Sequence, residues 1–541
     1  MTEIPDPKAV SILRDFERMR SERTTYESAW QDIRRLVRPN TVDFQGSQSP
    51  GDVRTVRMYD GTAMQANNDL ANAVHTFIVN PAERNFGIKV TGDRELNRDP
   101  AVIAWCDQVS DIIGSEYLDD RTRFTASIQE CFLDLAFGNL ILNQEWDSDS
   151  GHLSFKACPL SYTFFEEDHN GVVNKLARQC DMTLRQILGD WPETHWDGMD
   201  KEPYDRKFCV IHIVQPRAES ERLYGRQDGP NMPFSSCWVM KEKQMKLDEG
   251  GYISFPYHVG RWSKSDEEMY GRGPAINCLP EIRMLQRMEW TIIRAWEKAV
   301  DPPLVMPSDG FLTPFKTAAG SINYVDPSYG KDDVVRSLRH EGDLVGAETK
   351  TDQKRDFVRQ CFYAEWVKLA PKKERQTAYE ISELVEQQLR MMAPMLGRLQ
   401  GELYVPCIQR SFQLLQRAGM IPPAPPQMRG RTIEVDYVSA AARAQAATRI
   451  VGYGRLIQNL ATMQPFAPDV MDSLNTDEIA QDMAMVLGVP ARGLRPPEDI
   501  SELRNARAEQ QQAQQMAVAA EPISKAVLNL SQAQQAGNVA A

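Results

Sequence analysis

The sequence predicts an α+β fold, in which a largely antiparallel sheet lies between two helical regions. Three observations indicate this class. Apolar residues recur at intervals of three and four near the N-terminus, a spacing typical of amphipathic helices. Between residues 140 and 262 the chain instead carries short alternating or β-rich runs, separated by turn signals. From residue 280 the helical spacing returns.

The N-terminal region contains three predicted helices. The first covers residues 8–37, and only Arg23 interrupts its apolar face. The second covers residues 62–79 and stops before Pro81, because the residue before a proline disfavours the helical conformation. The third covers residues 124–138.

The predicted strands follow in the middle of the chain. They are the runs LILNQEW (140–146), HLSFKAC (152–158), FCVIHIV (208–214), CWVMK (237–241) and YISFPYHV (252–259). Turns are indicated by DSDSG (147–151), HNG (169–171) and DEGG (248–251). Short strands joined by such turns predict antiparallel pairing.

A helical hairpin is predicted after the sheet. Residues 280–300 and 348–370 have helical spacing and flank a segment, 301–347, that is rich in Gly, Pro, Asp and Ser. Within that segment LVMP (304–307) and INYV (322–325) are strand-like. The two flanking helices are comparable in length, so we expect them to pair.

The C-terminal part is mainly helical. Residues 378–418 have the spacing of one long helix, and a bend is predicted at Pro394, at Pro406 or at both, because each proline removes a backbone donor. A strand, TIEVDYV (432–438), and amphipathic helices to about residue 488 follow. The glutamine-rich C-terminal end, which includes EQQQAQQ (509–515), is as consistent with a helix as with a disordered tail.

Composition excludes several classes of protein. The chain has 541 residues and a formal net charge of -13, which argues against a protein that coats nucleic acid over its whole surface. Its nine cysteines form no CxxC, which argues against a zinc ribbon or a disulfide framework. The sequence shows no signal peptide and no uncharged run of about 18 residues. We therefore expect that the protein is made in the cytosol and is not inserted into a membrane.

Enzyme motifs are missing from the sequence. The chain has no GxxxxGK[ST], HExxH or GxSxG, so we predict no catalytic residue, no metal site and no cofactor. Acidic clusters occur at Asp119-Asp120, Glu166-Glu167-Asp168 and Asp332-Asp333, and we interpret them as solvated turns. Cys209 and His212 share one predicted strand and are interpreted as core residues.

One region is basic within this acidic chain. The two predicted hairpin helices and the turn at 371–375 together carry twelve positive and eight negative side chains, a net charge of +4. Lys372, Lys373 and Arg375 are concentrated in that turn, beside Pro371. A solvated charged surface is the default interpretation, and a role in binding nucleic acid requires that the turn lie next to it.

Several segments together resemble a known family. They are MYDGTAMQANNDLANAVHTFIVNPAERNF (58–86), RWSKSDEEMYGRGPAINCLPEIRMLQRMEW (261–290), KAVDPPLVMP (298–307), the stretch from QTAYEIS to IPPAPP (376–426) and IEVDYVSAAARAQ (433–445). In this order and spacing they are similar to the head-to-tail connector, or portal, proteins of short-tailed tailed bacteriophages. Asn85 departs from the pattern, since an aromatic residue is expected before Phe86.

The resemblance implies a portal-protein fold, whose subunits form a ring, usually a dodecamer, at one vertex of the capsid. The implied parts are an α/β wing (1–279, with strand 432–438), two stem helices (280–300 and 348–370), a small clip (301–347), a channel loop (371–377), a long bent helix (378–418), a helical crown (439–500) and a helical barrel or disordered tail (501–541).

The resemblance also implies a function. Lys372, Lys373 and Arg375 would face double-stranded DNA in the channel without reading its sequence, and the ring would be a passive conduit during genome packaging and ejection. Expected partners are further copies of the chain, the major capsid protein and scaffold, the terminase large subunit as the motor, and the tail adaptor. The expected location is the portal vertex of the virion, and the host cytoplasm during assembly.

Two matters stay open from the sequence. Trp290, Trp296 and Trp366 are candidate anchors of the subunit interface, but packing inside one subunit explains them equally well. The alternative functions are another non-catalytic virion protein, such as an internal core or scaffold component, and more remotely a metal-dependent nuclease built on the acidic clusters.

Overall fold

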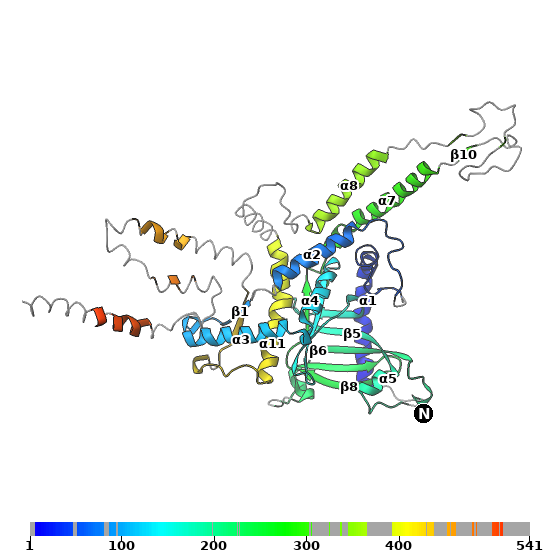
Figure 1. Ribbon diagram of the computed structural model, residues 1–541. Coiled ribbons are helices and arrows are strands. Elements are labelled where there is room, and N and C mark those ends of the chain that lie inside the picture. Colours follow the sequence, from blue (N-terminus) through cyan, green and yellow to red (C-terminus); the bar gives the residue numbers. More distant parts are fainter. Residues whose placement is uncertain are drawn as a thin grey trace, which may run out of the picture. The chain divides into compact units, whose positions relative to one another are not determined.

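The computed structural model describes most of the N-terminal three quarters of the chain (Figure 1). The described residues are 6–46, 51–79, 86–93, 96–196, 199–223, 226, 228–301, 304–305, 324, 336–337, 344–364, 392–428, 430–437, 452–454, 456–460, 462, 476, 479–480, 483, 500–507 and 509–511. They fall into two compact units, which are described separately. The first comprises Met1–Phe86, Asp111–Ile421 and Tyr437–Ala441, and the second comprises the remainder.

Helix α1 (Pro7–Leu36) confirms the first predicted helix. Asp6 caps it, since its Oδ1 accepts a hydrogen bond of 2.9 Å from the Lys8 amide. Arg23, the residue that interrupts the apolar face, is itself buried, with 1% of its surface exposed. Its guanidinium donates to the carbonyl oxygens of Leu160, Ser161 and Thr163 and pairs with Glu27, which satisfies the buried charge.

A five-stranded antiparallel sheet lies beside α1 (Figure 1). Its order is β4 (Thr163–Glu167), β5 (Val173–Thr183), β6 (Lys207–Pro216), β7 (Phe234–Met240) and β8 (Met245–Tyr252). Side chains of β6 alternate between two clusters, as a period of two requires. Ile211 and Ile213 pack with Phe16 of α1, whereas Val210 packs with Trp196 and the short helix α5 (Leu184–Asp190).

The predicted turn at DEGG is wrong, because residues 248–251 lie inside strand β8. Gly251 has a packing reason instead, because a Cβ on it would lie 2.3 Å from the carbonyl oxygen of Gly229. The turns at DSDSG and HNG are confirmed, and Gly151 and Gly171 adopt φ angles of 70° and 77° there. Strands β4 and β5, which flank the second turn, were missed.

A second antiparallel sheet has the order β3-β2-β9. Its strands are β2 (Asn139–Asp147), β3 (His152–Ala157) and β9 (Tyr257–Arg261). The first two confirm predicted runs, whereas the run predicted at 252–259 is divided between the last residue of β8 and the start of β9. Helix α4 (Phe124–Leu133) packs on this sheet and on α2 (Thr62–Ile78). The α-helix ends five residues before the predicted end at 138, because a 3-10 turn, Asp134–Ala136, replaces its last turn.

Helices α7 (Leu279–Val300) and α8 (Leu344–Cys361) pack together as the predicted hairpin (Figure 1). The short helix α6 (Pro274–Asn277) precedes α7. The predicted helix 348–370 instead begins at Leu344, and its regular part ends at Cys361, because Tyr363 adopts a φ angle of 57°. Residues 365–370 lie outside the described residues.

The segment between these helices contains one described strand pair. β10 (Leu304–Val305) pairs antiparallel with β11 (Arg336–Ser337), so the strand predicted at LVMP is confirmed in part. Tyr324 of the predicted strand INYV has no regular structure, and the other residues of that run lie outside the described part.

The long predicted helix is described from residue 392 onward. Residues 392–399 are helical, and Pro394 lies within this run. A π-helical turn follows at Gln400–Tyr404, and α11 (Val405–Arg417) continues the helix. The irregularity therefore lies just before Pro406, whose missing N–H cannot continue the regular bonding pattern.

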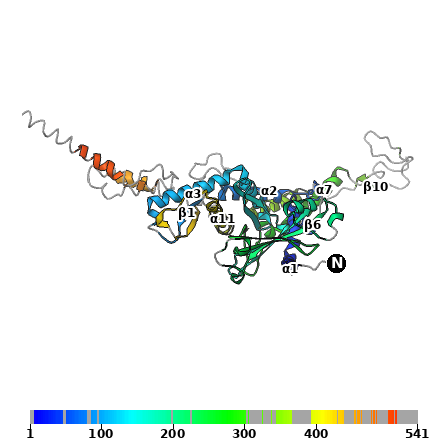
Figure 2. The ribbon, with the colours of Figure 1, turned by 90° about the horizontal axis from the view of Figure 1, so that it is seen from below.

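The second unit contains the two-stranded sheet of β1 (Phe86–Val90) and β12 (Ile433–Tyr437), which confirms the predicted strand at 432–438. The N-terminal half of α3 (Pro100–Leu118), a helix that was not predicted, lies beside this pair (Figures 1 and 2). Trp105 Nε1 donates a hydrogen bond of 3.0 Å to the carbonyl oxygen of Pro422. Helical residues are also described at 452–454, 456–460, 500–507 and 509–511.

Candidate nucleic-acid interface

The predicted site residues are divided between described and undescribed parts of the chain. Lys372, Lys373, Arg375 and Trp366 lie outside the described residues. Trp290 and Trp296 lie on α7, in the hairpin that leads toward the basic turn. The candidate interface is therefore built from the described surface of this hairpin.

A basic stripe runs along one face of α7, a feature that the charge count alone does not reveal. Arg283, Arg287, Trp290, Arg294 and Lys298 follow one another at intervals of four, three, four and four residues. At 3.6 residues per turn, these intervals place all five side chains on one face. The stripe spans about 22 Å of helix, at about 1.5 Å per residue.

An aromatic ring lies between two of these arginines. The Cζ atoms of Arg287 and Arg294 lie 4.5 Å and 4.8 Å from the centroid of the Trp290 ring, within the range of cation–π attraction. Both arginines are exposed, whereas Trp290 is half-buried. Trp290 thus holds the two guanidinium groups in place on the surface.

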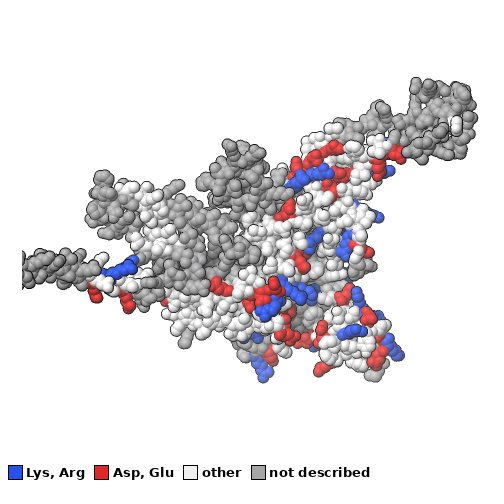
Figure 3. Space-filling view, in the orientation of Figure 1, with Lys and Arg blue, Asp and Glu red and all other residues white. Residues whose placement is uncertain are grey.

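The charges of α8 are largely neutralised. Arg355 forms ion pairs with Asp60, Glu289 and Asp352, Lys354 pairs with Glu281 at 2.6 Å, and Arg359 pairs with Asp356. Figure 3 shows basic and acidic side chains next to one another on the hairpin. Burial raises the pKa of Glu289, and the charge of Arg355 opposes this shift.

On α7, Arg283 pairs with Asp32 of α1. Arg287 and Arg294, within the described part of the chain, contact the Trp290 ring rather than a carboxylate. The positive charge available to a partner therefore lies at the middle of α7.

The base of the hairpin is fixed to the rest of the first unit. The side-chain oxygen of Gln286 accepts hydrogen bonds from the amides of Tyr59 and Asp60, at 2.7 Å and 3.1 Å, and its nitrogen donates to the Asp60 carbonyl at 2.6 Å. Arg355 adds a bond of 2.9 Å to the Asp60 carboxylate. These contacts hold the start of α2 between the two hairpin helices.

A different face of α7 is apolar and exposed. Ile293, Trp296 and Val300 are 41%, 48% and 80% exposed, respectively. They continue the face that Ile282 and Leu285 bury nearer the base. Trp296 thus presents a large apolar surface to solvent, whereas Trp290 is already packed by its own subunit.

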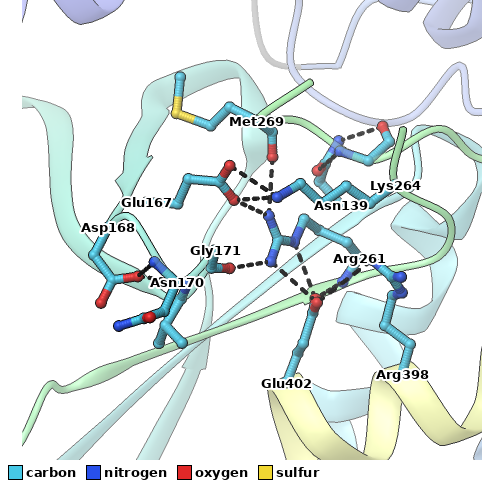
Figure 4. Close-up of polar contacts among 12 residues, drawn as sticks. Asn139, Glu167, Asp168, Asn170, Gly171, Arg261, Lys264, Met269, Arg398 and Glu402 are labelled. Carbon is cyan, nitrogen blue, oxygen red and sulfur yellow. Dashed lines mark hydrogen bonds and ion pairs between the residues drawn. The ribbon is translucent and has the colours of Figure 1, made fainter. Parts of the chain in front are cut away.

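Arg261 forms the main polar centre of the first unit (Figure 4). Only 2% exposed, it donates to both carboxylate oxygens of Glu402 at 3.0 Å, to Glu167 at 2.6 Å and to the carbonyl oxygens of Gly171 and Met269. Although burial acts in the opposite direction, hydrogen bonds from Lys264 and Arg261 lower the pKa of Glu167. The centre joins strands β4 and β9 to the π-turn of the long helix.

The interpretation of Glu166 and Glu167 as part of a solvated turn is therefore wrong. Both lie at the end of strand β4, where Glu166 pairs with Arg18 and Lys175 and Glu167 pairs with Arg261 and Lys264. Their partners come from distant segments, which a local pattern does not reveal. Asp119 does cap a short turn, and Asp332 and Asp333 lie outside the described residues.

His212 is a core residue, as predicted. Its Nδ1 lies 2.9 Å from Tyr257 Oη, its Nε2 lies 2.9 Å from Ser236 Oγ, and its ring stacks on Trp238. Within the described residues, no group of three or more His, Cys, Asp or Glu side chains is arranged to hold a metal ion. None of the described helices is long and apolar enough to cross a membrane.

The hairpin, the sheets and the long helix define an α+β protein whose exposed features are a basic stripe and an apolar face. The model of one family, described as bacteriophage head to tail connecting protein, matches residues 9–494. The chain belongs to this family.

Two portal proteins of known phages are similar to the chain over most of their length. The chain is 27% identical over 517 residues to the probable portal protein of Bordetella phage BPP-1, covering 94% of this chain and 92% of the relative. It is 22% identical over 534 residues to the portal protein of Salmonella phage epsilon15, covering 97% and 95%. A solved structure titled as the virion of a native gene transfer agent particle aligns with 10% identity over 79% of this chain and 88% of its own, with a TM-score of 0.35.

Proposed function

We propose that the chain is a subunit of a portal ring, a dodecamer at one vertex of a phage capsid, through which double-stranded DNA passes during packaging and ejection. The observation that carries this proposal is the family match over residues 9–494, together with two portal relatives aligned over more than nine tenths of their length. The proposed assignment of parts keeps 1–279 as wing, 280–300 and 348–370 as stem, and 301–347 as clip.

The DNA contacts in this proposal are electrostatic. Lys372, Lys373 and Arg375 form the channel loop, and the exposed pair Arg287 and Arg294 adds a second positive position on each stem. Duplex DNA carries one charge per about 1.7 Å of its axis, so such side chains meet phosphates at any position along it. Because each subunit offers few unpaired positive charges, the affinity of the ring for DNA stays low. DNA that moves through the channel is therefore released as readily as it is bound.

The subunit interface in this proposal is heterologous, because a closed ring joins the front of one subunit to the back of the next. Trp296 and Trp366 are its candidate anchors. Trp290 is the weaker candidate, since Arg287 and Arg294 cover its ring within one subunit.

The ring acts without catalysis of its own. The terminase large subunit supplies the motor and docks at the clip, the tail adaptor binds after packaging, and the major capsid protein and scaffold surround the wing. Assembly takes place in the host cytoplasm.

Electron microscopy of the purified protein, combined with the particle mass, tests this function. Rings with a central hole and a mass near twelve times 61.4 kDa are expected. A closed oligomer without a channel would exclude the conduit and favour an internal core or scaffold component. Divalent-metal-dependent cleavage of plain duplex DNA would instead favour a nuclease.

A further inference from the structure

Trp290 lies between two exposed arginines on α7. The Cζ atoms of Arg287 and Arg294 are 4.5 Å and 4.8 Å from the centroid of its ring. Arg287 lies about one helical turn before Trp290 and Arg294 about one turn after it, because they are three and four positions away in the sequence. The two guanidinium groups therefore approach the ring from opposite directions along the helix.

We propose that Arg287, Trp290 and Arg294 form a phosphate clamp, in which Trp290 is the positioning residue. Its ring holds the two guanidinium groups in place for the phosphates of DNA, and it does not itself stack on a nucleobase. The inference rests on the proposed function, because it names the part of the DNA that the stem contacts. It goes further by giving the ring a role and by assigning the contact to the sugar-phosphate backbone.

Contact with the ring leaves both arginines able to bind phosphate. A guanidinium that stacks on an aromatic face keeps its N–H groups in its own plane, so it can donate from its edge to an anion. Within the described part of the chain, Arg287 and Arg294 contact this ring rather than a carboxylate. Arg355 of the same hairpin instead donates to three carboxylates. The clamp is thus the part of the hairpin that still has charged donors to offer.

The spacing of the two arginines suits a duplex. Arg287 and Arg294 are seven positions apart, which is about 10 Å along the helix at about 1.5 Å per residue. Each DNA strand carries one phosphate per about 3.4 Å of duplex axis, so both groups can meet phosphates of the same duplex. Because every sequence presents these phosphates, the contact does not depend on the bases.

The ring strengthens binding by restricting the arginines in advance. Fixing a flexible side chain at an interface lowers the affinity by a factor of about two to ten. Tryptophan attracts cations more strongly than the other aromatic side chains, so contact with Trp290 restricts both arginines before DNA arrives. Loss of the ring should therefore weaken binding without changing the number of charges that meet phosphates.

A tryptophan beside arginines could instead serve as a stacking platform for unpaired bases. Such a platform needs a ring face that is open to solvent. The Trp290 ring is half-buried, and the two guanidinium groups lie against it from both directions along the helix. The geometry therefore favours contact with the backbone of the DNA over stacking on its bases.

The test compares Trp290→Leu, which removes the aromatic face, with Trp290→Phe, which retains one. Fluorescence anisotropy measures binding of the full-length protein to duplex DNA at several salt concentrations. We expect Trp290→Leu to weaken the affinity at least about fourfold, since each arginine contributes a factor of about two or more. The slope of log K against log salt should stay unchanged, because both charges remain. Trp290→Phe should restore most of the affinity.

A second measurement does not depend on DNA binding. Phenylglyoxal modifies exposed guanidinium groups, and mass spectrometry of the digested protein gives the rate at each arginine. Trp290→Leu should raise the rates at Arg287 and Arg294. The rate at Arg359, which pairs with Asp356 on α8, should stay the same and serves as the control. In the unmodified protein, duplex DNA should protect both clamp arginines from phenylglyoxal.

Four results would overturn the inference. The first is an unchanged duplex affinity in Trp290→Leu, and the second is unchanged modification rates at both arginines in that variant. The third is no protection of these arginines by duplex DNA in the unmodified protein, a readout that needs no variant to fold. The fourth is tighter binding of a single-stranded oligonucleotide than of an abasic oligomer of equal length, with the difference lost in Trp290→Leu, because the ring would then stack on bases.

Failure of the proposed function is recognised separately. Electron microscopy of the unmodified protein would then show no rings with a central channel. The phenylglyoxal rates in Trp290→Leu would still report whether the ring holds the two arginines.

Discussion

Arg261 and Glu402 form a bidentate ion pair in which the Nε and Nη2 atoms of the arginine each lie 3.0 Å from a carboxylate oxygen. The Arg261 amide adds a third bond of 3.0 Å to the same carboxylate. Glu402 belongs to the π-turn of the long helix, and Arg261 ends strand β9. The pair therefore fixes the irregular turn of that helix to the edge of the sheet.

Removing the Glu402 charge should destabilise the first unit. The substitution Glu402→Gln leaves the buried guanidinium of Arg261 without its main partner, and loss of one member of a buried pair costs on the order of 3 kcal/mol. The check is chemical denaturation followed by tryptophan fluorescence. The surface pair Arg206 and Glu202 supplies the control, since Glu202→Gln should cost under about 1 kcal/mol. Equal midpoints for the two variants would contradict the role of the pair.

The basic stripe should determine part of the salt dependence of DNA binding. Each phosphate contact contributes a slope of about 0.9 in log K against log salt, so Arg287→Ala with Arg294→Ala should lower the slope by about 1.8 per subunit engaged. Fluorescence anisotropy with duplex DNA at several salt concentrations measures it. Arg359→Ala, on the same hairpin but paired with Asp356, is the matched control and should leave the slope unchanged. An identical slope in the double variant would exclude contact with DNA at this stripe.

The channel loop is tested in phage. Replacing Lys372, Lys373 and Arg375 by alanine should leave ring assembly intact and impair packaging or retention of DNA, because the phosphates lose their positive partners. DNA content per particle is the measurement. Unchanged DNA filling in particles that carry the triple substitution would remove the proposed role.

Trp296 should contribute to association between subunits. Trp296→Ala removes a large apolar surface that is 48% exposed in one subunit, so it should shift the mass distribution toward smaller species without unfolding the chain. Mass photometry, with circular dichroism as the folding control, separates the two effects. Tyr204→Ala, at a ring that is 62% exposed and far from the hairpin in sequence, should leave assembly unchanged. If the Trp296→Ala variant forms rings as stable as those of the unmodified protein, the interface between subunits does not include Trp296.

Two buried histidines predict a loss of stability on mild acidification. Burial, aided by the charge of Arg178, lowers the pKa of His212 to about 3, and burial with Arg410 does the same for His258. An unfolded histidine has a pKa of about 6.5, so below that pH the unfolded chain binds protons that the folded chain excludes. Stability is therefore complete above about 6.5 and falls as the pH drops toward about 3.

The histidine prediction is measured as the free energy of unfolding between pH 6.5 and 5, before most carboxylates titrate. Each histidine should contribute a slope approaching about 1.4 kcal/mol per pH unit. His258→Gln retains a side chain able to bond with Gln144 and should remove roughly one histidine's share of the slope. A slope unaffected by this substitution would show that His258 is not the group that titrates.

Local patterns account for the elements that were predicted well. Apolar spacing found α1 and α7 within one residue of their ends, because a helix on a core buries the same face at each turn. The same reasoning overlooked α3, whose sequence places apolar residues on more than one face. It also placed a turn in β8, because two adjacent glycines indicate a turn unless a neighbouring segment requires the space.

The amino-acid sequence by itself determined the fold class, the order of the helical and strand-rich regions, and the resemblance that led to the family, since these depend on periodicity and on residues in a fixed order. Only the tertiary structure decided which charges are neutralised and which groups meet. Arg23 with Leu160 and Arg261 with Glu402 are partners separated by 137 and 141 positions, respectively. The path of the chain brings such groups together, and no local pattern encodes that path.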